Sequence, residues 1–371
     1  MLAIAALTAL LVALALARWP APNVVAPAPA GAPSAGEQAA APWQHDQHWP
    51  RLSPGMRIGA GSGVAVDAEG HVWLLHRAGR PFTNDTPIDD PTVLRLHPVT
   101  GEVERAWGGG RFLSPHGLAI DHDGMLWITD VMANTVHRFT QDGREQLRVG
   151  RPHSALQAAC VAVRTRLPNL PCALGDDQFA RPTDVAVAPD GTFHVADGYR
   201  NSRVARFDAS GRFLDAWGSL GNAEDELFLP HGIAMDGQGR LLVADRRNAR
   251  VQVRDQAGRV LAQWQPAGMG RPFGVSVGPG GEVFVADGGD ALDMPEATPR
   301  IPPRSQAVRL SANGRMEARW GWHGDALPAG LLAHDIAVGH DGSLYIATLD
   351  ARAIHRLVPV PAGAGATDAA N

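Results

Sequence analysis

Three histidines occupy one position of a repeated segment in this chain of 371 residues. The six copies of the segment begin in turn with Ser62, His116, Thr183, His231, Phe273 and His334. If each copy is one blade of a closed ring, every second blade directs an imidazole toward the axis from the same height. Three imidazole nitrogens with a fourth position left open are ligands typical of a catalytic zinc ion. Zinc is favoured over copper or iron because the site offers imidazole and no thiolate.

A second ion is indicated by Asp335, which follows the last of these histidines where the other two are followed by glycine. A carboxylate at this position can point deeper into the channel of the ring. The main-chain carbonyls of Val64 and Leu118 belong to the same inner ring, and such oxygen ligands suit calcium. This ion would be structural, connecting blades across the axis. The alternative is that Asp335 only bonds a turn, since Asp184 occupies the same position in a copy without histidine.

A further group of residues follows the second strand of three copies. Arg77 and Arg246 occupy this position in two of them, and Tyr199 lies one residue later in a third. Because the second strand runs back toward the histidine face, these side chains can surround the ion. Tyr199 lies in a loop, which favours a role in chemistry, whereas Tyr345 lies within a strand pattern and is expected in the core. The alternative for Tyr199 is a surface aromatic without a function.

The repeat itself predicts the fold. Each copy has a short strand of small and apolar residues, a turn and a second strand, as in HGLAIDHDGMLWITD from His116. Asp-Gly between such runs is a strong hairpin signal. The segments that follow supply two more strands, and four strands make a propeller blade. We therefore expect an all-β, six-bladed β-propeller of four-stranded antiparallel blades over residues 45–360. The copies are 54, 67, 48, 42 and 61 residues apart. Blades of this kind recur at about 40–50 residues, and the longer intervals contain insertions, two of them at residues 150–180 and 289–305.

The composition and the ends of the chain point to an exported globular protein. A net charge of −5 lacks the basic excess of a nucleic-acid surface. Residues 1–18 are mainly apolar and indicate a signal peptide or, if uncleaved, an N-terminal membrane anchor. Residues 19–44, rich in Ala and Pro, are expected to be a disordered linker, and residues 361–371 a disordered tail. The propeller would then be periplasmic, secreted or tethered to a membrane by its N-terminus.

Two cysteines, Cys160 and Cys172, lie in an insertion over residues 150–180. In an exported protein a disulfide within this insertion is the expected state. Two free thiols are the alternative.

Taken together, these motifs resemble the peptidyl-α-hydroxyglycine α-amidating lyases, which are NHL-like propellers. The resemblance runs from about residue 61 to residue 357. It is carried by HR at 76–77, PHGLAID at 115–121, PTDVAVAPDG at 182–191, VADGYRNSRV at 195–204, LPHGIAMD at 229–236, VADRRNARVQ at 243–252 and HDIAV at 334–338. The resemblance implies catalytic zinc on His116, His231 and His334. It also implies structural calcium on Asp335 and the carbonyls of Val64 and Leu118, with Tyr199, Arg77 and Arg246 acting on the substrate.

The implied reaction cleaves a peptide or acyl compound that ends in α-hydroxyglycine into the amide and glyoxylate, on a monomeric enzyme. Zinc would lower the pKa of the substrate hydroxyl, and Tyr199 would act as general base, its pKa lowered by the metal and Arg246. Arg77 is the choice for fork-like binding of the substrate carboxylate, although the two arginines could exchange roles. The alternatives are a non-catalytic NHL-type propeller that binds a ligand or partner, and a metal-dependent lactonase or esterase propeller.

Overall fold

The computed structural model describes residues 43–360 apart from 57, 165, 168–169, 290–304, 322–330 and 351. The expected leader at 1–18, the tail at 361–371, and most of the linker at 19–44 lie outside these residues. Most of a second expected insertion, at 289–305, does so too. Within the described part of the chain, no helix is long and apolar enough to cross a membrane.

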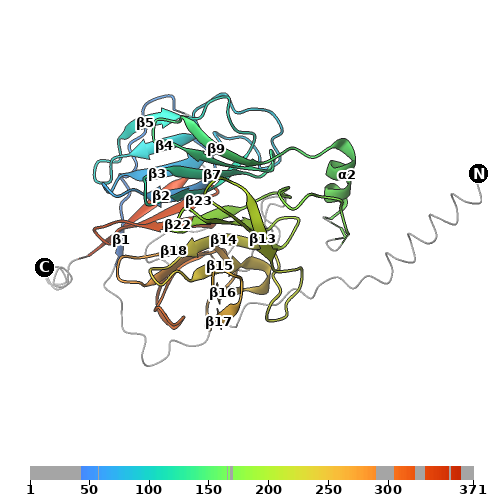
Figure 1. Cartoon of the computed structure of the whole chain (residues 1–371). Helices are drawn as coiled ribbons and strands as arrows, with labels where there is room; N and C mark the ends of the chain where they lie inside the picture. The colour runs from blue at the N-terminus through green and yellow to red at the C-terminus, as the bar shows by residue number, and fades with distance from the viewer. Residues whose placement is uncertain are drawn as a thin grey trace, which may run out of the picture.

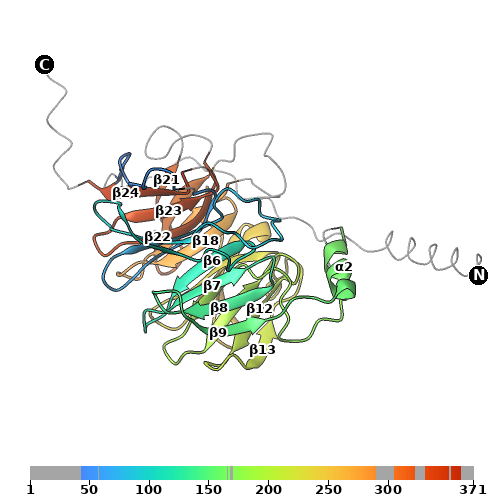
Figure 2. The same ribbon diagram turned by 90° about the horizontal axis from the view of Figure 1, so that it is seen from above.

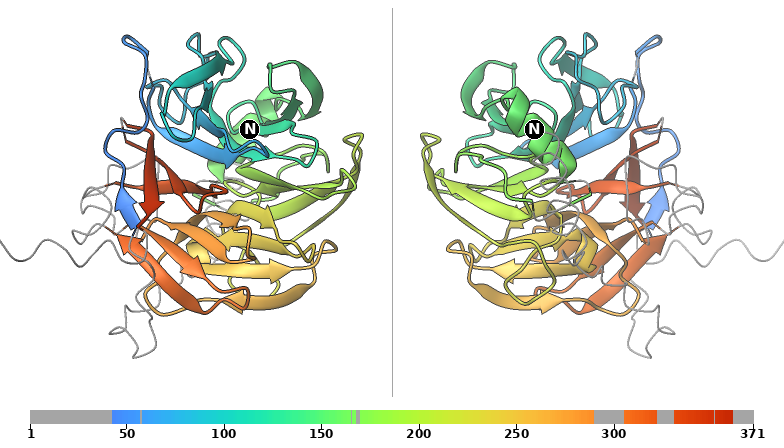
Figure 3. Two further views of the ribbon diagram at one scale, coloured as in Figure 1. Left: turned by 90° about the vertical axis from the view of Figure 1, so that its left-hand side faces the viewer. Right: turned by 90° about the vertical axis from the view of Figure 1, so that its right-hand side faces the viewer.

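The described strands form six four-stranded antiparallel sheets around a central axis (Figures 1 and 3), which confirms the expected propeller. The first blade is β2 (Gly61–Val66), β3 (Val72–His76), β4 (Val93–Leu96) and β5 (Val103–Trp107). The second is β6 (Pro115–Ile120), β7 (Leu126–Asp130), β8 (Thr135–Phe139) and β9 (Glu145–Gly150). The third is β10 (Asp184–Val187), β11 (Phe193–Asp197), β12 (Arg203–Phe207) and β13 (Phe213–Trp217).

The fourth blade is β14 (Pro230–Met235), β15 (Leu241–Asp245), β16 (Arg250–Arg254) and β17 (Val260–Trp264), with the short 3-10 helix η1 (Arg246–Asn248) after β15. The fifth is β18 (Pro272–Val277), β19 (Val283–Asp287), β20 (Gln306–Leu310) and β21 (Met316–Gly321). The sixth is β22 (Ala333–Val338), β23 (Leu344–Thr348), β24 (Ile354–Pro359) and β1 (Trp43–His45). Each blade thus begins at the axis with the strand that carries the repeated position.

The ring is closed by the N-terminal strand. β1 pairs antiparallel with β24, with Trp43 opposite Pro359, so that the outermost strand of the last blade comes from the start of the described chain. The indole of Trp43 also donates to the carbonyl of Gly342 at 3.2 Å and packs on Trp320 with ring centroids 4.6 Å apart. Trp43 and Gln44, which were expected in the linker, therefore belong to the closing strand of the propeller.

The strands of a blade differ in how deeply their residues are buried. The second strand of each blade is buried along its whole length, as in β7. The outermost strands β5 and β13 instead alternate between partly buried and exposed residues, as expected for a sheet edge with one face in solvent. The apolar core is divided into clusters between neighbouring blades; one of them joins Phe193 of β11 to Trp127 of β7. Packing between blades thus fixes how the inner strands meet at the axis.

The insertion after β9 contains the helix α2 (Ala155–Val163), which stands apart from the sheets (Figures 1 and 2). Ser154 and Gln157 begin it with a capping box, in which each side chain bonds the other residue's backbone N–H. Cys160 and Cys172 form a disulfide, with their Cα atoms 5.8 Å apart. The expected disulfide is confirmed, and it joins the helix to the segment that returns to blade three.

A buried histidine of the core predicts how stability depends on pH. His194 in β11 is fully buried, its Nε2 lies 3.2 Å from the carbonyl of Gln256, and burial lowers its pKa to about 4. Because the unfolded chain takes up this proton first, the contribution of His194 is fully present above about pH 6.5. It is lost as the pH falls toward 4, and amounts to up to about 3 kcal/mol.

We expect His194→Gln, whose amide can still donate to Gln256, to lose less free energy of unfolding between pH 7 and pH 5 than the unsubstituted protein. Urea titrations at the two pH values measure the difference. Equal losses in both proteins would contradict the assignment.

Candidate metal and catalytic site

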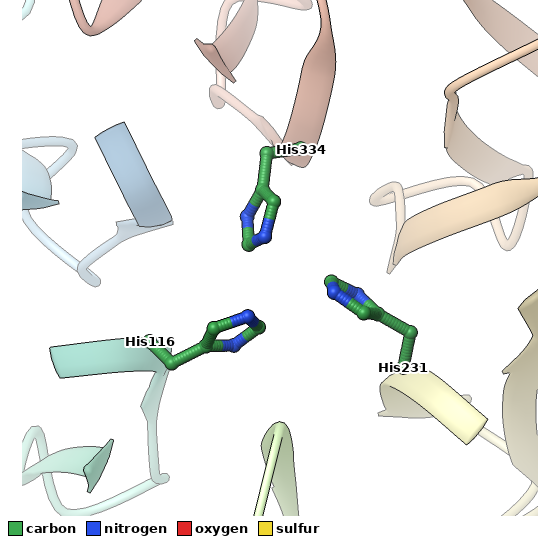
Figure 4. A group of neighbouring side chains, drawn as sticks. All are labelled: His116, His231 and His334. Atoms are coloured by element: carbon green, nitrogen blue, oxygen red, sulfur yellow. The ribbon is translucent and has the colours of Figure 1, made fainter. Parts of the chain in front are cut away.

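The three histidines of the repeat meet on the axis. His116, His231 and His334 come from the starts of β6, β14 and β22, and their rings point toward one another (Figure 4). All three are buried, their ring centroids are 4.7 to 4.9 Å apart, and they offer ligand nitrogens that lie within 4.8 Å of one another. The spacing of the repeat therefore did predict a spatial cluster.

The copies without histidine orient the imidazoles. The Nδ1 of His116 lies 2.8 Å from the carbonyl of Thr183, that of His334 lies 2.8 Å from the carbonyl of Ser62, and that of His231 lies 2.9 Å from Phe273 O. A carbonyl only accepts hydrogen bonds, so each Nδ1 carries the proton and each Nε2 keeps its lone pair. The alternation of the sequence thus has a physical reason, because each histidine blade is followed around the ring by a blade that holds its imidazole.

Burial keeps these imidazoles neutral. It lowers the pKa of His116 to about 3 and the pKa values of His231 and His334 well below 6.5. The positive charges of Arg77 and Arg246 act in the same direction on His116. Metal ligation requires the neutral form of histidine, and a second hydrogen bond from Nδ1 is typical of metal-bound imidazole. Three buried, neutral and converging Nε2 atoms are a donor set that fits a zinc ion.

Hydroxyl groups hold the chain just before two of the ligands. Ser62 Oγ donates to the carbonyl of Pro115 at 2.9 Å, and Thr183 Oγ1 donates to the carbonyl of Pro230 at 3.0 Å. Each of these prolines directly precedes a histidine, His116 or His231, so a hydroxyl of the neighbouring blade holds the main chain next to the ligand. The side chain and the main chain of the intervening copies both contribute to the geometry of the histidines.

The glycine that follows His116 is required by the same contact. A Cβ at Gly117 would lie 2.4 Å from Thr183 O, the atom that orients His116. Because that neighbour is backbone, we expect Gly117→Ala to lower the free energy of unfolding by about 2 kcal/mol and to weaken metal binding. Gly237→Ala is the matched control, since no atom lies within 4 Å of its added Cβ. Chemical denaturation and metal titration of both variants measure the effect, and equal behaviour would contradict it.

Tyr199 lies directly over the histidines. Its Oη is 3.0 Å from Nε2 of His116 and 3.2 Å from Nε2 of His231. The loop that carries it is anchored by Asp197, whose Oδ1 accepts from Ala180 N–H at 2.7 Å and whose Oδ2 accepts from Arg203. The sequence placed Tyr199 beside the histidines correctly, and the anchoring aspartate is the residue that ends the second strand in several copies.

Burial and the neighbouring arginines act in opposite directions on the pKa of Tyr199. Burial raises its pKa above 10, although Arg246 and Arg77, and to a smaller degree Arg181 and Arg200, act to lower it. The arginines alone therefore do not offset the cost of burying a phenolate. A lowered pKa needs a further positive charge next to the Oη atom, at the position of the three Nε2 atoms.

The two expected arginines also reach the site. Arg246 is fully buried, with its guanidinium 3.8 Å from the ring centre of Phe273, and that ring packs on His231 at 5.0 Å. Arg77 is 4% exposed, and its Nε has no hydrogen-bond partner among the described residues. Burial lowers the pKa of Arg77 to about 10, so it stays charged at neutral pH. Both guanidinium groups are therefore buried cations beside the histidines and Tyr199.

Two residues of the site have no signal in the repeat. Phe82 is buried in the loop after β3, and its ring centre is 5.0 Å from that of Tyr199 and 6.1 Å from that of His116. The guanidinium of Arg181 lies 5.6 Å from the same Phe82 ring. Both residues lie in connections between strands, where the copies differ, so periodicity does not identify them.

Below the histidines, two carboxylates approach the axis. Asp335 Oδ2 accepts from the N–H of Val64 at 2.9 Å, and Asp184 Oδ2 accepts from the N–H of Ile233 at 3.0 Å. Burial raises the pKa of Asp184 to about 7 and that of Asp335 well above 3.8, with the charge of Asp184 as a further cause for Asp335. The two residues line both a cavity of about 10 Å³ under the histidines and a channel of about 290 Å³ beyond it.

Val64 and Leu118, the two other expected calcium ligands, line the same channel. The structure thus brings the expected group together at the axis. It adds Asp184, which occupies the same position of the repeat as Asp335 and lines the same cavity and channel.

Comparison with known proteins points to one group of enzymes. The NHL repeat matches residues 179–207 and 229–253. The chain is 30% identical over 345 residues to peptidyl-alpha-hydroxyglycine alpha-amidating lyase 1 of Drosophila melanogaster, covering 84% of this chain and 58% of that protein. It is 34% identical over 217 residues to a probable lyase of the same name from Caenorhabditis elegans, covering 54% of this chain and 57% of that protein.

A longer relative is peptidyl-glycine alpha-amidating monooxygenase B of Xenopus laevis, 30% identical over 85% of this chain. The chain spans only 35% of that protein's length. Among solved structures, a streptogramin B lyase matches with a TM-score of 0.55 at 13% identity, covering 85% of this chain and 97% of that one. A gluconolactonase from Xanthomonas campestris matches with a TM-score of 0.56 at 15% identity, covering 87% and 99%. These two likenesses show the propeller fold alone.

The sequence similarities, together with the NHL repeats, lead to one assignment. This chain is a homologue of the peptidyl-α-hydroxyglycine α-amidating lyases, built on an NHL-repeat six-bladed β-propeller.

Proposed function

We propose that this protein is a zinc-dependent lyase that cleaves peptidyl- or acyl-α-hydroxyglycine into the amide and glyoxylate. The observation that carries the proposal is the position of Tyr199 Oη within 3.2 Å of two Nε2 atoms of the three-histidine cluster. A base and a metal-binding group that lie within a few ångströms of each other suit a substrate whose hydroxyl must lose a proton. The names of the homologous lyases support this reaction class.

The histidine cluster would hold the metal. His116, His231 and His334 present neutral nitrogens from three blades and leave the side toward Tyr199 for the substrate. Bound there, zinc would supply a Lewis acid that lowers the pKa of the α-hydroxyl. It would also provide the positive charge that the arginines alone do not supply to Tyr199.

Tyr199 would move the proton. In the reaction the hydroxyl O–H bond and the C–N bond break, a C=O bond forms, and the leaving amide nitrogen gains a proton. Loss of one proton and gain of another balance, so Tyr199 Oη can take the hydroxyl proton and return it to the nitrogen. General acid–base catalysis by one positioned group typically contributes about 10²–10⁴ in rate.

The two arginines would bind the glyoxylate part of the substrate. Arg77 and Arg246 are buried cations that flank the histidines, and a guanidinium can grip a carboxylate through two parallel hydrogen bonds. We assign the substrate carboxylate to Arg77, whose buried Nε is available to donate to it. Arg246, stacked on Phe273, is then held close to Tyr199 and favours its ionised form.

The carboxylates below the histidines suit a second, structural cation. Asp335 and Asp184 lie on opposite sides of the narrow cavity, and a hard ion such as calcium prefers carboxylate and carbonyl oxygens. Val64 and Leu118 would add their carbonyls. We also propose that the protein acts outside the cytoplasm, which its disulfide supports, since such bonds persist in oxidising compartments.

The test is direct turnover. Purified protein with measured metal content is incubated with N-acetyl-α-hydroxyglycine, and glyoxylate and acetamide are quantified together. Equal amounts of both products, dependent on zinc, are expected. Bound zinc without either product would favour a non-catalytic binding propeller, and hydrolysis of a lactone instead would favour the lactonase alternative.

A further inference from the structure

A cavity lies beside the catalytic tyrosine, between α2 and blades two and three. Its volume is about 400 Å³, within the range of small-molecule sites. Most of its wall is apolar, formed by Val131, Met132, Pro152, Ala158, Val161 and Ala162. The rest of the wall is polar and consists of Asn134, His153, Arg181 and Arg200. The cavity thus combines an apolar part with a polar part whose basic side is formed by the two arginines.

Its basic side is shared with the proposed active site. Arg200 follows Tyr199 directly and donates to the carbonyl of Tyr199 at 3.0 Å. Arg181 and Tyr199 both pack on the ring of Phe82. These contacts connect the basic side of the cavity to Tyr199 and Phe82, the aromatic residues beside the histidines.

Hydrogen bonds and a disulfide hold the wall formed by α2 in place. Arg164, at the C-cap of the helix, donates to the carbonyl of Arg200 at 2.8 Å and also bonds the side chain of Asn201. Gln157 donates to the carbonyl of Ala173 at 2.8 Å, and the disulfide joins Cys160 to the same returning segment. These contacts tie the helix to the loop that carries Tyr199, so the cavity is preformed next to the site.

We propose that this cavity binds the apolar side chain or acyl chain on the amide side of the scissile bond. The ligand class is an apolar acyl group or hydrophobic residue that precedes the α-hydroxyglycine. The arginine pair would face the polar amide end of this group while α2 covers its apolar end. The proposal rests on the proposed lyase function and adds its substrate preference. Because each buried methylene group strengthens binding severalfold, the affinity for the substrate should increase with the length of its acyl chain.

The kinetic test compares N-decanoyl-α-hydroxyglycine with N-acetyl-α-hydroxyglycine. We expect kcat/KM of the unsubstituted protein to favour the decanoyl compound by about tenfold or more. Ala158→Trp, at an exposed helix position that lines the cavity, should reduce this preference about tenfold by filling it. Ala159→Trp is the matched control, because Ala159 is exposed on the same helix and does not line the cavity.

The expected result is a preference that falls in Ala158→Trp and persists in Ala159→Trp. Turnover of both compounds without any effect of chain length would overturn the cavity assignment and leave the lyase function standing. A stronger preference for an acidic acyl group, tested with N-succinyl-α-hydroxyglycine, would also overturn it, since the arginines would then be the main determinant.

A binding measurement separates this inference from the reaction. N-decanoylglycine lacks the hydroxyl and cannot be cleaved, so calorimetry reports its affinity whether or not the protein is a lyase. Tighter binding than N-acetylglycine, lost in Ala158→Trp and kept in Ala159→Trp, supports the cavity even if no glyoxylate is ever released. Equal binding of the two glycine compounds would overturn it.

Discussion

Replacing His231 by alanine is expected to reduce lyase activity by about 10³-fold or more and to abolish stoichiometric zinc binding. The substitution leaves only two of the three buried nitrogen ligands. A bound Lewis acid typically lowers the barrier of such a reaction by several kcal/mol, and this stabilisation would be lost. The position of the ring supports this size of effect, since its Nδ1 is held 2.9 Å from Phe273 O and its Nε2 faces Tyr199 at 3.2 Å. Glyoxylate release and metal analysis of the purified variant measure both consequences.

A second readout does not depend on activity. Zinc added to the unsubstituted protein should raise its Tm, because a ligand that binds only the folded state stabilises it, whereas His231→Ala should show no comparable rise. His194→Ala is the matched control, since it removes an equally buried histidine that contacts the carbonyl of Gln256 and does not belong to the cluster. It should lose stability and retain the zinc-dependent rise. Zinc binding by His231→Ala at the level of the unsubstituted protein would refute the metal site.

Replacing Tyr199 by phenylalanine should lower kcat by about 10²–10⁴ while zinc remains bound. The substitution removes only Oη, the atom within 3.2 Å of both His116 and His231, and leaves the ring packed on Phe82. A loss of the proton-transfer group without loss of the metal distinguishes a base from a structural residue. Single-turnover kinetics with N-acetyl-α-hydroxyglycine and metal analysis give the two values.

Tyr345→Phe is the natural control, because the chain has two tyrosines. Tyr345 is buried in the core, where its Oη donates to Pro98 O at 3.4 Å, so its loss should leave kcat within about twofold.

Since burial raises the pKa of Tyr199, activity should increase with pH wherever the phenolate forms, and this rising limb should disappear in Tyr199→Phe. Unchanged kcat in Tyr199→Phe would assign the proton transfer to another group.

The periodic features of the fold follow from the sequence because each blade repeats the same local physics. Asp121 shows this in the second copy. Its Oδ1 accepts from the N–H of Met125 at 3.0 Å and its Oδ2 accepts from the indole of Trp127 at 2.8 Å, which fixes the hairpin turn. Such contacts act within a few residues, so the pattern predicts them. The pairing of β1 with β24, which closes the ring, was not predicted because strands far apart in the sequence leave no local signal of their pairing.

The same division holds in the site. The residue types and the positions of His116, His231 and His334 were enough to predict that they meet, because an equal position in every second blade implies an equal height at the axis. Periodicity also located Tyr199, Arg77 and Arg246. It gave no indication of Phe82 or Arg181, which lie in connections of unequal length and acquire their places only through packing against other blades.

The amino-acid sequence by itself determined the number of blades, the three-histidine cluster and the residues around it, since repetition converts position along the chain into position around a ring. The tertiary structure decided what depends on neighbouring blades. Carbonyls of the intervening copies set the proton on each Nδ1, burial raises the pKa of Tyr199 in spite of the arginines, and Asp184 joins Asp335 across the axis. Burial and contacts between distant blades arise only when the ring is closed, so these properties cannot be obtained from any one copy of the repeat.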